Sequence, residues 1–524
     1  MAGMPSADSP TGSPSTSSPS TVSPSTVSSS GSGTRVADLT HRDADWAGLR
    51  VLVAGLGVSG FAAADALLER GAHVIAVDAS DRETNTALGE RAKILDILGA
   101  DLRFGAEHVE SLPADELDLV VTSPGWAPHQ PLLAAAADAG LPIWGDVELA
   151  WRLRPREGAA PWLLVTGTNG KTTTVQMLTS MLRAAGLRAV SVGNVGTPVL
   201  EAIMDPAPHD VLAVELSSFQ LHWSNSLAPQ ASVCLNVAPD HVDWHGSYEE
   251  YLKAKGKVYE RTEMACIYNV QDEQTMRLVE DAEVQEGCRA VGFTLGVPSV
   301  SMVGVVEDVL ADRAFVEERR TSAAELGTLD DVRGDAPTVA PHQVANALAA
   351  AALARAHGIP PAAVREGLRT FTPEPHRIAE AGSIDGVRYV DDSKATNPHA
   401  AAASLSAFDP IVWIAGGLLK GADVDDLVRD HADRLRGVVL IGRDRDQIAQ
   451  ALARHAPEVP VVDVSATDTG VMDTVVAHAA ALAREGDVVL LAPAAASMDM
   501  FANYGARGDA FTEAVRRFGA TAGE

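Results

Sequence analysis

The sequence predicts an α/β protein built from three domains. From Trp46 onward, short apolar runs alternate with Ala-rich stretches of helical character. This repeated β-α-β order implies parallel sheets with helices on both faces. The chain has 524 residues, which is too long for a single hydrophobic core. We therefore expect several α/β units in succession along the chain.

The first unit, residues 46–148, opens with a strand at residues 51–54, the loop GLGVSG and the helical stretch FAAADALLERGA. The next strand, HVIAVD, ends at Asp78, and the later runs DLVVTSPG and LPIWGD are also strand-like. A glycine-rich turn between a strand and a helix is typical of the dinucleotide-binding fold. We expect a Rossmann-like N-terminal domain here.

The second unit, residues 149–372, contains WLLVTGTNGKTTT, the strands DVLAVE and ASVCLNVAPDH, and an Ala-rich helix over residues 346–357. We expect its charged stretch at residues 317–337 to be a surface loop. The Pro-rich segment FTPEPHR marks the boundary to a third unit, residues 373–524. That unit has the strands VRYVDD, IVWIAGG, GVVLIG, VPVVDV and DVVLLAP. A central P-loop ATPase-type domain and a Rossmann-like C-terminal domain are expected.

The N-terminal segment, residues 1–34, is almost wholly Ser, Thr, Pro and Gly. Such a segment buries too little apolar surface to offset its ordering entropy, so we expect a disordered tail. It has no charged stretch followed by an apolar one and is not typical of a secretory signal.

Composition and charge narrow the class of function. The net charge is −29, which disfavours nucleic acid and anionic membranes as partners. Any phosphate-bearing substrate must therefore be held by local cations, metal ions or backbone amides. The three cysteines match no metal-binding spacing, and no apolar run reaches the roughly 18 residues that span a bilayer. We expect a cytoplasmic protein with no membrane partner.

The strongest local motif lies between a strand and a helix, and it predicts a phosphate-binding loop. Glycines allow backbone amides to close around phosphates, and the following helix adds its positive N-terminal end. A lysine can reach the β- and γ-phosphates, and the next hydroxyl can bind Mg²⁺. The alternative is a glycine-rich turn without a ligand. The residues of this loop are Gly167, Thr168, Asn169, Gly170, Lys171, Thr172 and Thr173.

Two further polar residues, Glu215 and His241, follow apolar strands of the same unit. Strand C-termini of an open parallel sheet face the ligand crevice. A carboxylate and an imidazole there could hold a divalent cation near the nucleotide. Alternatively, Glu215 is an acid at a helix N-terminus and His241 a turn residue.

The loop at residues 55–60 matches the dinucleotide fingerprint, with an acid, Asp78, ending the next strand. Taken alone, this pattern predicts NAD binding and an oxidoreductase. Backbone amides and a helix N-terminus recognise any pyrophosphate, however, so the identity of the nucleotide stays open. A non-catalytic nucleotide-binding scaffold is a further alternative.

The C-terminal unit has polar and cationic loops after three of its strands: DDSKATN at residues 391–397, GGLLK at residues 416–420 and APAAAS at residues 492–497. Because the ends of parallel strands meet at one edge of a sheet, we expect these loops to form one substrate site. A solvated loop would explain any one of them alone.

As a set, these motifs resemble the Mur ligase family, and within it the members that add D-glutamate. The resemblance covers about residues 51–518 and rests on GTNGKTT, ELSSFQL, APDHVD, PHR, DDSKATN and GGLLK in the family's order. It implies an ATP-dependent ligase that joins D-glutamate to UDP-N-acetylmuramoyl-L-alanine through an acyl phosphate, in peptidoglycan precursor synthesis. We expect a monomer. The rivals of the same class are a sister ligase with another amino acid and a folylpolyglutamate-type enzyme.

The resemblance also implies roles for single residues. Lys171, Lys255 and His241 would be catalytic, with two Mg²⁺ ions held by Thr172, Glu215, His241 and a CO₂-derived carbamate on Lys255. Lys253 is the alternative position for that carbamate. ATP would also contact Asn346, Arg377 and Asp392. The D-glutamate pocket would contain Lys394, Thr396, Lys420, Ser497 and Tyr504. The UDP-substrate would contact Gly57, Val58, Ser59, Gly60 and Asn194.

Overall fold

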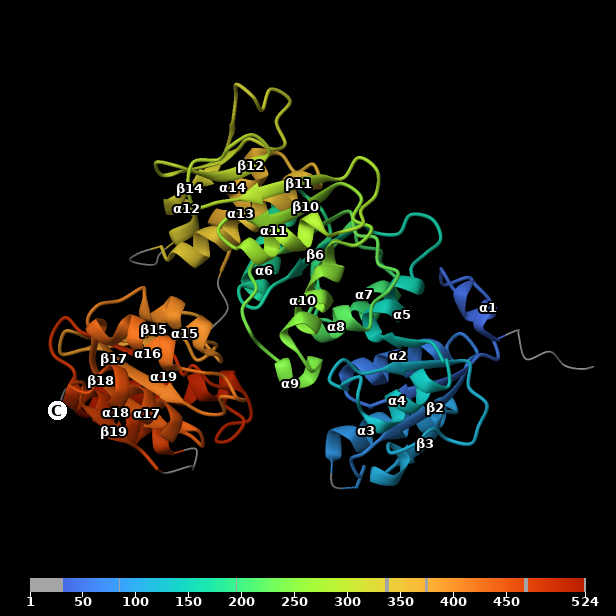
Figure 1. Cartoon of the computed structure of the whole chain (residues 1–524), viewed down its shortest axis with the longest axis horizontal. Helices are drawn as coiled ribbons and strands as arrows, with labels where there is room; N and C mark the ends of the chain where they lie inside the picture. Colours follow the sequence, from blue (N-terminus) through green and yellow to red (C-terminus); the bar gives the residue numbers. More distant parts are fainter. Residues whose placement is uncertain are drawn as a thin grey trace, which may run out of the picture.

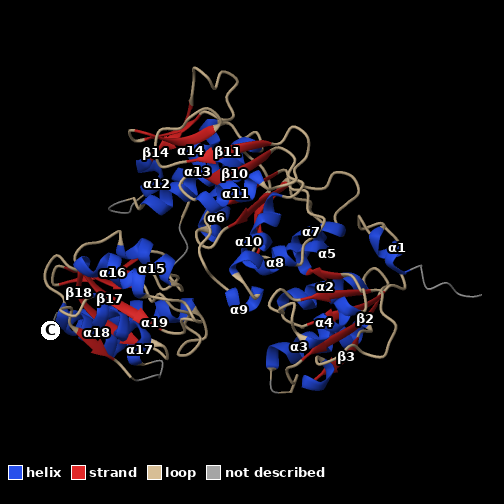
Figure 2. Cartoon of the chain, in the orientation of Figure 1, coloured by secondary structure: helices blue, strands red, loops and turns tan. Residues whose placement is uncertain are grey.

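The computed structural model describes residues 32–83, 85–194, 196–334, 339–372, 376–465 and 470–522. Within these residues, three β-sheets follow one another along the chain, each with helices packed against it (Figures 1 and 2). This confirms the predicted α/β class. Most of the predicted tail lies outside the described residues, and helix α1 (Ser32–Ala37) begins within its last three residues.

The N-terminal sheet has five parallel strands in the order β3-β2-β1-β4-β5. The order reverses between β1 and β4, and ligands of such sheets bind beyond the strand ends at this point. The strands are β1 (Arg50–Ala54), β2 (His73–Asp78), β3 (Asp101–Phe104), β4 (Leu119–Thr122) and β5 (Ile143–Gly145). The helices are α2 (Val58–Leu68), α3 (Thr86–Leu98), α4 (Pro131–Asp138) and α5 (Asp146–Arg152).

The central sheet has nine strands in the order β14-β13-β12-β11-β10-β9-β6-β8-β7. Strands β12, β13 and β14 pair antiparallel, and the other neighbours pair in parallel. The strands are β6 (Trp162–Thr166), β7 (Ala189–Gly193), β8 (Val211–Glu215), β9 (Ala231–Cys234), β10 (Ala265–Asn269), β11 (Arg289–Phe293), β12 (Met302–Val306), β13 (Val309–Asp312) and β14 (Ala324–Thr328).

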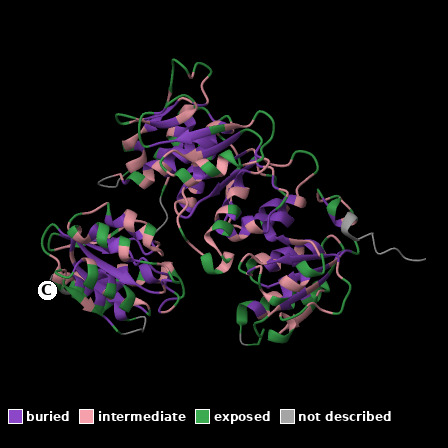
Figure 3. Cartoon of the chain, viewed as in Figure 1, coloured by how far each residue is buried: buried purple, intermediate pink, exposed green. Residues whose placement is uncertain are grey.

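The helices of this domain include α6 (Lys171–Ala184), α7 (Val199–Met204), α8 (Ser218–His222), α9 (Val242–His245), α10 (Tyr248–Gly256), α11 (Glu273–Glu280), α13 (Pro341–Ala356) and α14 (Pro361–Arg369). Helix α13 is the Ala-rich helix that the sequence predicts, and it lies against β9, β10 and β11. Nearly all of its alanines are buried, and their small side chains allow close approach to the sheet. Because the chain has few aromatic residues, its hydrophobic core depends on close packing of small side chains. Figure 3 shows the buried residues in purple.

The prediction of a surface loop at residues 317–337 was wrong in its middle part. Strand β14 and helix α12 (Leu329–Arg333) lie within it. Thr328 caps α12 by accepting a hydrogen bond from the Asp331 amide, and Leu326 is fully buried. Asp331 in turn forms ion pairs with Arg365 and Arg369 of α14. These partners are distant in sequence, so the local charge pattern did not reveal them.

The C-terminal sheet has six strands in the order β15-β16-β20-β17-β18-β19, parallel except for β15. The strands are β15 (Ala379–Ile384), β16 (Val387–Asp391), β17 (Ile411–Gly416), β18 (Leu435–Ile441), β19 (Val461–Asp463) and β20 (Val488–Leu491). The helices are α15 (Pro398–Leu405), α16 (Asp425–His431), α17 (Arg445–His455), α18 (Val471–Leu482) and α19 (Tyr504–Ala522). No helix in the described ranges is long and apolar enough to cross a membrane.

Candidate active site

A cavity of about 920 Å³ lies between the central sheet and the C-terminal sheet. Its walls come from the loop after β6, the ends of β8 and β9, helix α13 and the loops around β16. Most residues that the sequence assigns to ATP and metal binding line it. These are Thr168, Asn169, Gly170, Lys171, Thr172, Thr173, Glu215, His241, Asn346, Arg377 and Asp392.

The loop between β6 and α6 has the geometry of an anion site. Gly170 has φ +84°, and a Cβ there would lie 2.3 Å from Asn346 Oδ1, so only glycine fits. Helix α6 begins at Lys171, and no side chain of the described ranges caps its N-terminus. Its first amides and the positive end of the helix dipole therefore remain for a phosphate.

Lys171 is folded back over this loop. Its Nζ donates to the carbonyls of Gly167 and Thr168, both at 2.9 Å. Burial lowers the pKa of Lys171, while the charges of Glu215 and Asp240 oppose that shift. The ammonium thus lies beside the helix terminus, at the place from which a lysine can bind a phosphate.

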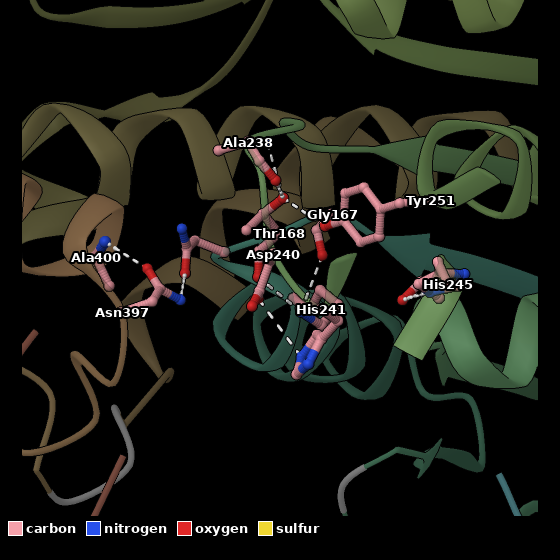
Figure 4. A network of polar contacts seen from close by, with 12 residues as sticks. Gly167, Thr168, Ala238, Asp240, His241, His245, Tyr251, Asn397 and Ala400 are labelled. Carbon is pink, nitrogen blue, oxygen red and sulfur yellow. Dashed lines mark hydrogen bonds and ion pairs between the residues drawn. The ribbon is translucent and has the colours of Figure 1, made fainter. Parts of the chain in front are cut away.

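Side chains from neighbouring strand ends fix the loop (Figure 4). Thr168 Oγ1 accepts from the Ala238 amide at 2.9 Å and lies 2.8 Å from the Tyr251 hydroxyl. Asn169 donates its amide to Asn236 Oδ1 at 2.9 Å and accepts from Asn397 Nδ2 at 3.2 Å. The last bond joins the central domain to the C-terminal sheet. Sequence reasoning missed the roles of Asn236 and Tyr251, although Asn236 follows a strand as Glu215 does.

Glu215 is the last residue of β8, and His241 lies at the start of α9, beyond the end of β9. Glu215 is 1% exposed, its Oε1 accepts from Asn194 Nδ2 at 2.9 Å, and its buried Oε2 has no hydrogen-bond partner among the described residues. His241 Nε2 lies 3.5 Å from Asp240 Oδ2, and its ring packs edge-on against Phe219. Burial lowers the pKa of His241. Among the described residues, no three His, Cys, Asp or Glu side chains gather tightly enough to form a metal site by themselves.

Lys255 is buried behind the phosphate loop, only 2% exposed. Its Nζ donates to Gly167 O at 2.6 Å and to Thr166 Oγ1 at 3.3 Å. Burial, followed by the positive charge of Lys171, lowers the pKa of Lys255 to about 7. Lys253, the alternative position, points to solvent and lies 3.9 Å from Glu250. The two lysines are thus clearly different in environment.

The candidate amino-acid residues fall into two groups. Lys394, Thr396 and Tyr504 line the cavity, and Lys394 Nζ donates to the Tyr504 hydroxyl at 2.9 Å. Lys420 and Ser497 do not line it. Lys420 is exposed, with φ +53°, and its charge nonetheless acts on His241. Ser497 is buried in the neighbouring loop.

The residues expected to contact the UDP-substrate also lie in two separate places. Gly57, Val58, Ser59 and Gly60 lie at the start of α2 in the N-terminal domain, outside the cavity, whereas Asn194 lines the cavity beside Glu215. A Cβ on Gly60 would lie 1.7 Å from Gly55 O, which explains the glycine there.

Asp78, the acid of the dinucleotide fingerprint, accepts hydrogen bonds from two backbone amides, one in the glycine-rich loop after β1 and one in its own loop. Its two carboxylate oxygens accept from the amides of Leu56 and Ser80, both at 2.8 Å. In a dinucleotide enzyme this carboxylate would bind the ribose hydroxyls. Its local hydrogen bonds do not favour the NAD interpretation.

Comparisons with known proteins identify the family of the chain. Family models match three consecutive parts of the chain: the Mur ligase MurD-like N-terminal domain at residues 49–145, the Mur ligase middle domain at residues 165–354 and the Mur ligase glutamate ligase domain at residues 376–495. The chain belongs to the Mur ligase family. The phosphate loop, Glu215 and His241 of this Mur ligase fall within the middle-domain match, and Lys394 within the glutamate-ligase match.

Relatives of this Mur ligase match it over almost their whole length. A UDP-N-acetylmuramoylalanine–D-glutamate ligase of Streptomyces avermitilis is 60% identical over 476 residues, covering 91% of this chain and 100% of the relative. One of the same name from Leifsonia xyli is 53% identical over 503 residues, covering 93% of this chain and 96% of the relative.

Solved structures share the fold of this Mur ligase at low identity. The UDP-N-acetylmuramate–alanine ligase MurC of Thermotoga maritima is 19% identical with a TM-score of 0.51, and covers 90% of this chain and 99% of that one. MurF of Acinetobacter baumannii is 18% identical with a TM-score of 0.52, and covers 88% of this chain and 90% of that one.

Proposed function

We propose that this Mur ligase joins D-glutamate to UDP-N-acetylmuramoyl-L-alanine at the expense of ATP, in the synthesis of peptidoglycan precursors. The observation that carries the proposal is the 60% identity across the full length of a relative named for this reaction. The phosphate loop and the loop of Lys394 face one cavity, which supports a reaction between a nucleotide and an amino acid.

The chemistry requires activation because a carboxylate does not react with an amine. A carboxylate oxygen of the L-alanyl group attacks the γ-phosphorus of ATP, and ADP leaves. The neutral amine of D-glutamate then attacks the carbonyl carbon of the acyl phosphate, the nitrogen releases a proton, and inorganic phosphate leaves with the bonding electrons. Lys171 and the N-terminus of α6 would neutralise the γ-phosphate during the first step. Asn346, Arg377 and Asp392 would hold the rest of the nucleotide.

Magnesium fits the donor set of the cavity. Mg²⁺ prefers oxygen ligands, and Glu215 offers a buried carboxylate oxygen that has no hydrogen-bond partner in the described part of the chain. Thr172 and His241 lie on the same cavity wall and would complete the protein's share. When bound, two ions would screen the repulsion between the carboxylate and the γ-phosphate.

A carbamate on Lys255 would supply the missing acidic ligand. The lysine is buried, and its nitrogen donates to one carbonyl oxygen and one hydroxyl oxygen, with no hydrogen bond to a carboxylate among the described residues. A depressed pKa leaves much of the amine neutral near pH 7, which is the form that adds CO₂. The product is a carboxylate that can bind Mg²⁺ where an ammonium would repel it.

The remaining assignments complete the proposal. Lys394, Thr396, Lys420, Ser497 and Tyr504 would bind D-glutamate. Gly57, Val58, Ser59, Gly60 and Asn194 would contact the UDP-substrate, and closure of the domains would bring these groups together. We place the domain boundaries at residues 46–148, 149–372 and 373–524, and infer a monomeric, cytoplasmic enzyme that needs no nucleic acid or membrane.

Phosphate release tests the function directly. With ATP, Mg²⁺ and UDP-N-acetylmuramoyl-L-alanine, we expect release only on addition of D-glutamate, with a product heavier by one glutamyl residue. L-Glutamate and other amino acids serve as controls. Release with a different amino acid would assign a sister specificity. A lack of release with every amino acid, together with NAD-dependent absorbance changes, would favour an oxidoreductase.

The buried carboxyl of Asp392 predicts a pH dependence of ATP binding. Burial raises the pKa of Asp392 to about 6, and Ser404 Oγ donates a hydrogen bond to it. Below pH 6 the group becomes neutral and loses an acceptor, so we expect KM for ATP to rise by about tenfold per pH unit well below that pKa. The measurement compares the wild type with Asp392→Asn from pH 5 to 8. If KM for ATP changed with pH equally in the wild type and in Asp392→Asn, the role of Asp392 in ATP binding would be contradicted.

A further inference from the structure

Arg507, a buried arginine in the first turn of α19, joins two loops of the C-terminal domain. It is 1% exposed, and all three nitrogens of its guanidinium donate hydrogen bonds. Nε donates to Ser393 Oγ at 3.0 Å, and one terminal nitrogen donates to Ser393 O at 2.8 Å. The other donates to Ala495 O at 3.1 Å. Ser393 precedes Lys394, and Ala495 lies two residues before Ser497.

The same connection extends to the third loop and to the start of α19. Leu418 exchanges two backbone hydrogen bonds with Ala496, at 2.8 and 2.9 Å, and this fixes the loop at residues 416–420. Ser393 Oγ donates to Tyr504 O at 2.7 Å. One guanidinium therefore holds, directly or through one residue, the three loops and the helix start that carry Lys394, Lys420, Ser497 and Tyr504.

The charge of Arg507 is unusual for a structural bridge. Its hydrogen-bond partners among the described residues are a hydroxyl and two carbonyls, and the carboxylates of Asp499 and Asp391 act on it only through space. Burial lowers the pKa of Arg507 to about 10, so it stays protonated at neutral pH. A buried charge without a hydrogen-bonded counter-ion is a poor source of stability. The positive charge of Arg507 would favour the binding of an anionic substrate nearby.

We propose that Arg507 is a positioning residue of the amino-acid site, which sets the distance between Lys394 and Tyr504 and favours a dicarboxylic substrate. The inference rests on the proposed function and deepens it. Lys394 Nζ lies 2.9 Å from the Tyr504 hydroxyl and 4.5 Å from the centre of its ring. Loss of the bridge through Ser393 would release Tyr504 from this arrangement.

Steady-state kinetics of the full-length enzyme test the proposal with three variants. In Arg507→Met we expect KM for D-glutamate to rise by about 10- to 100-fold, because small displacements of positioning groups have effects of this size. KM for ATP and for the UDP-substrate should stay within about twofold of wild type. Arg507→Lys keeps the charge but cannot donate to all three acceptors in the same geometry. Its KM for D-glutamate should lie between those of the wild type and Arg507→Met. Arg436→Met, which breaks an ion pair between the partly exposed Arg436 and the buried Asp487 outside the three loops, is the control.

A second variant keeps the test decisive if Arg507→Met does not fold. Ser393→Ala retains the guanidinium and removes only the hydroxyl between Arg507 and Tyr504, and we expect the same selective rise in KM for D-glutamate. Added guanidinium should partly restore Arg507→Ala. Equal changes in all three KM values, or a lower melting temperature with unchanged kinetics, would overturn the inference. A wild type inactive with D-glutamate would instead refute the proposed function.

Discussion

In the Lys255→Ala variant we expect turnover to fall by about 10²- to 10³-fold, the usual cost of losing one preorganised electrostatic group. Lys255 is buried beside the phosphate loop, and its carbamate would provide a metal ligand that alanine lacks. The metal would then be held more weakly next to the γ-phosphate. Measurement of kcat at saturating substrates, with the apparent Kd for Mg²⁺, checks this.

Rescue and a neighbouring lysine make the test specific. A small carboxylate such as acetate or formate should enter the space left by the side chain and restore part of the activity of Lys255→Ala. Lys253→Ala serves as the matched control, since Lys253 is exposed on the same helix, and it should behave as wild type. Labelled bicarbonate should give a carbamate signal by ¹³C NMR that Lys255→Ala lacks. Full activity of Lys255→Ala would refute the carbamate.

In Lys171→Met we expect kcat to fall by about 10²- to 10³-fold, with a smaller effect on binding of the UDP-substrate. Methionine keeps the length and the apolar stem but removes the positive charge at the start of α6. The charge is needed chiefly when the γ-phosphate is transferred, so the loss should be in kcat more than in KM. Single-turnover measurements of ADP formation would show it.

Lys171→Arg separates charge from shape. The larger planar guanidinium cannot make the two short contacts to Gly167 and Thr168 carbonyls in the same space, so we expect recovery of only part of the activity. Thermal unfolding of both variants should remain close to wild type, because the lysine carbonyl contacts lie at a loop. An unchanged kcat in Lys171→Met would remove the phosphate loop from the proposed mechanism.

Local patterns were sufficient where the chemistry depends on neighbouring residues. The glycine spacing around Lys171 predicted a phosphate loop, and the structure places that loop between β6 and α6, with Gly170 against Asn346. Apolar runs predicted most strands of the parallel sheets, since strands buried on both faces are apolar throughout. The strand β14 escaped notice because its sequence, AELGT, is partly polar.

The sequence by itself determined the α/β class, the succession of three sheets and the order of the motifs, because these depend on periodicity and on short turns. Only the tertiary structure decided which motifs meet. It placed Lys255 inside and Lys253 outside, left one Glu215 oxygen without a hydrogen-bond partner among the described residues, and joined Asp78 to the Leu56 amide of the glycine-rich loop. It also joined Ser393 to Arg507, which lies 114 residues further along the chain. Burial and hydrogen bonding between distant segments are properties of packing, and no local pattern encodes them.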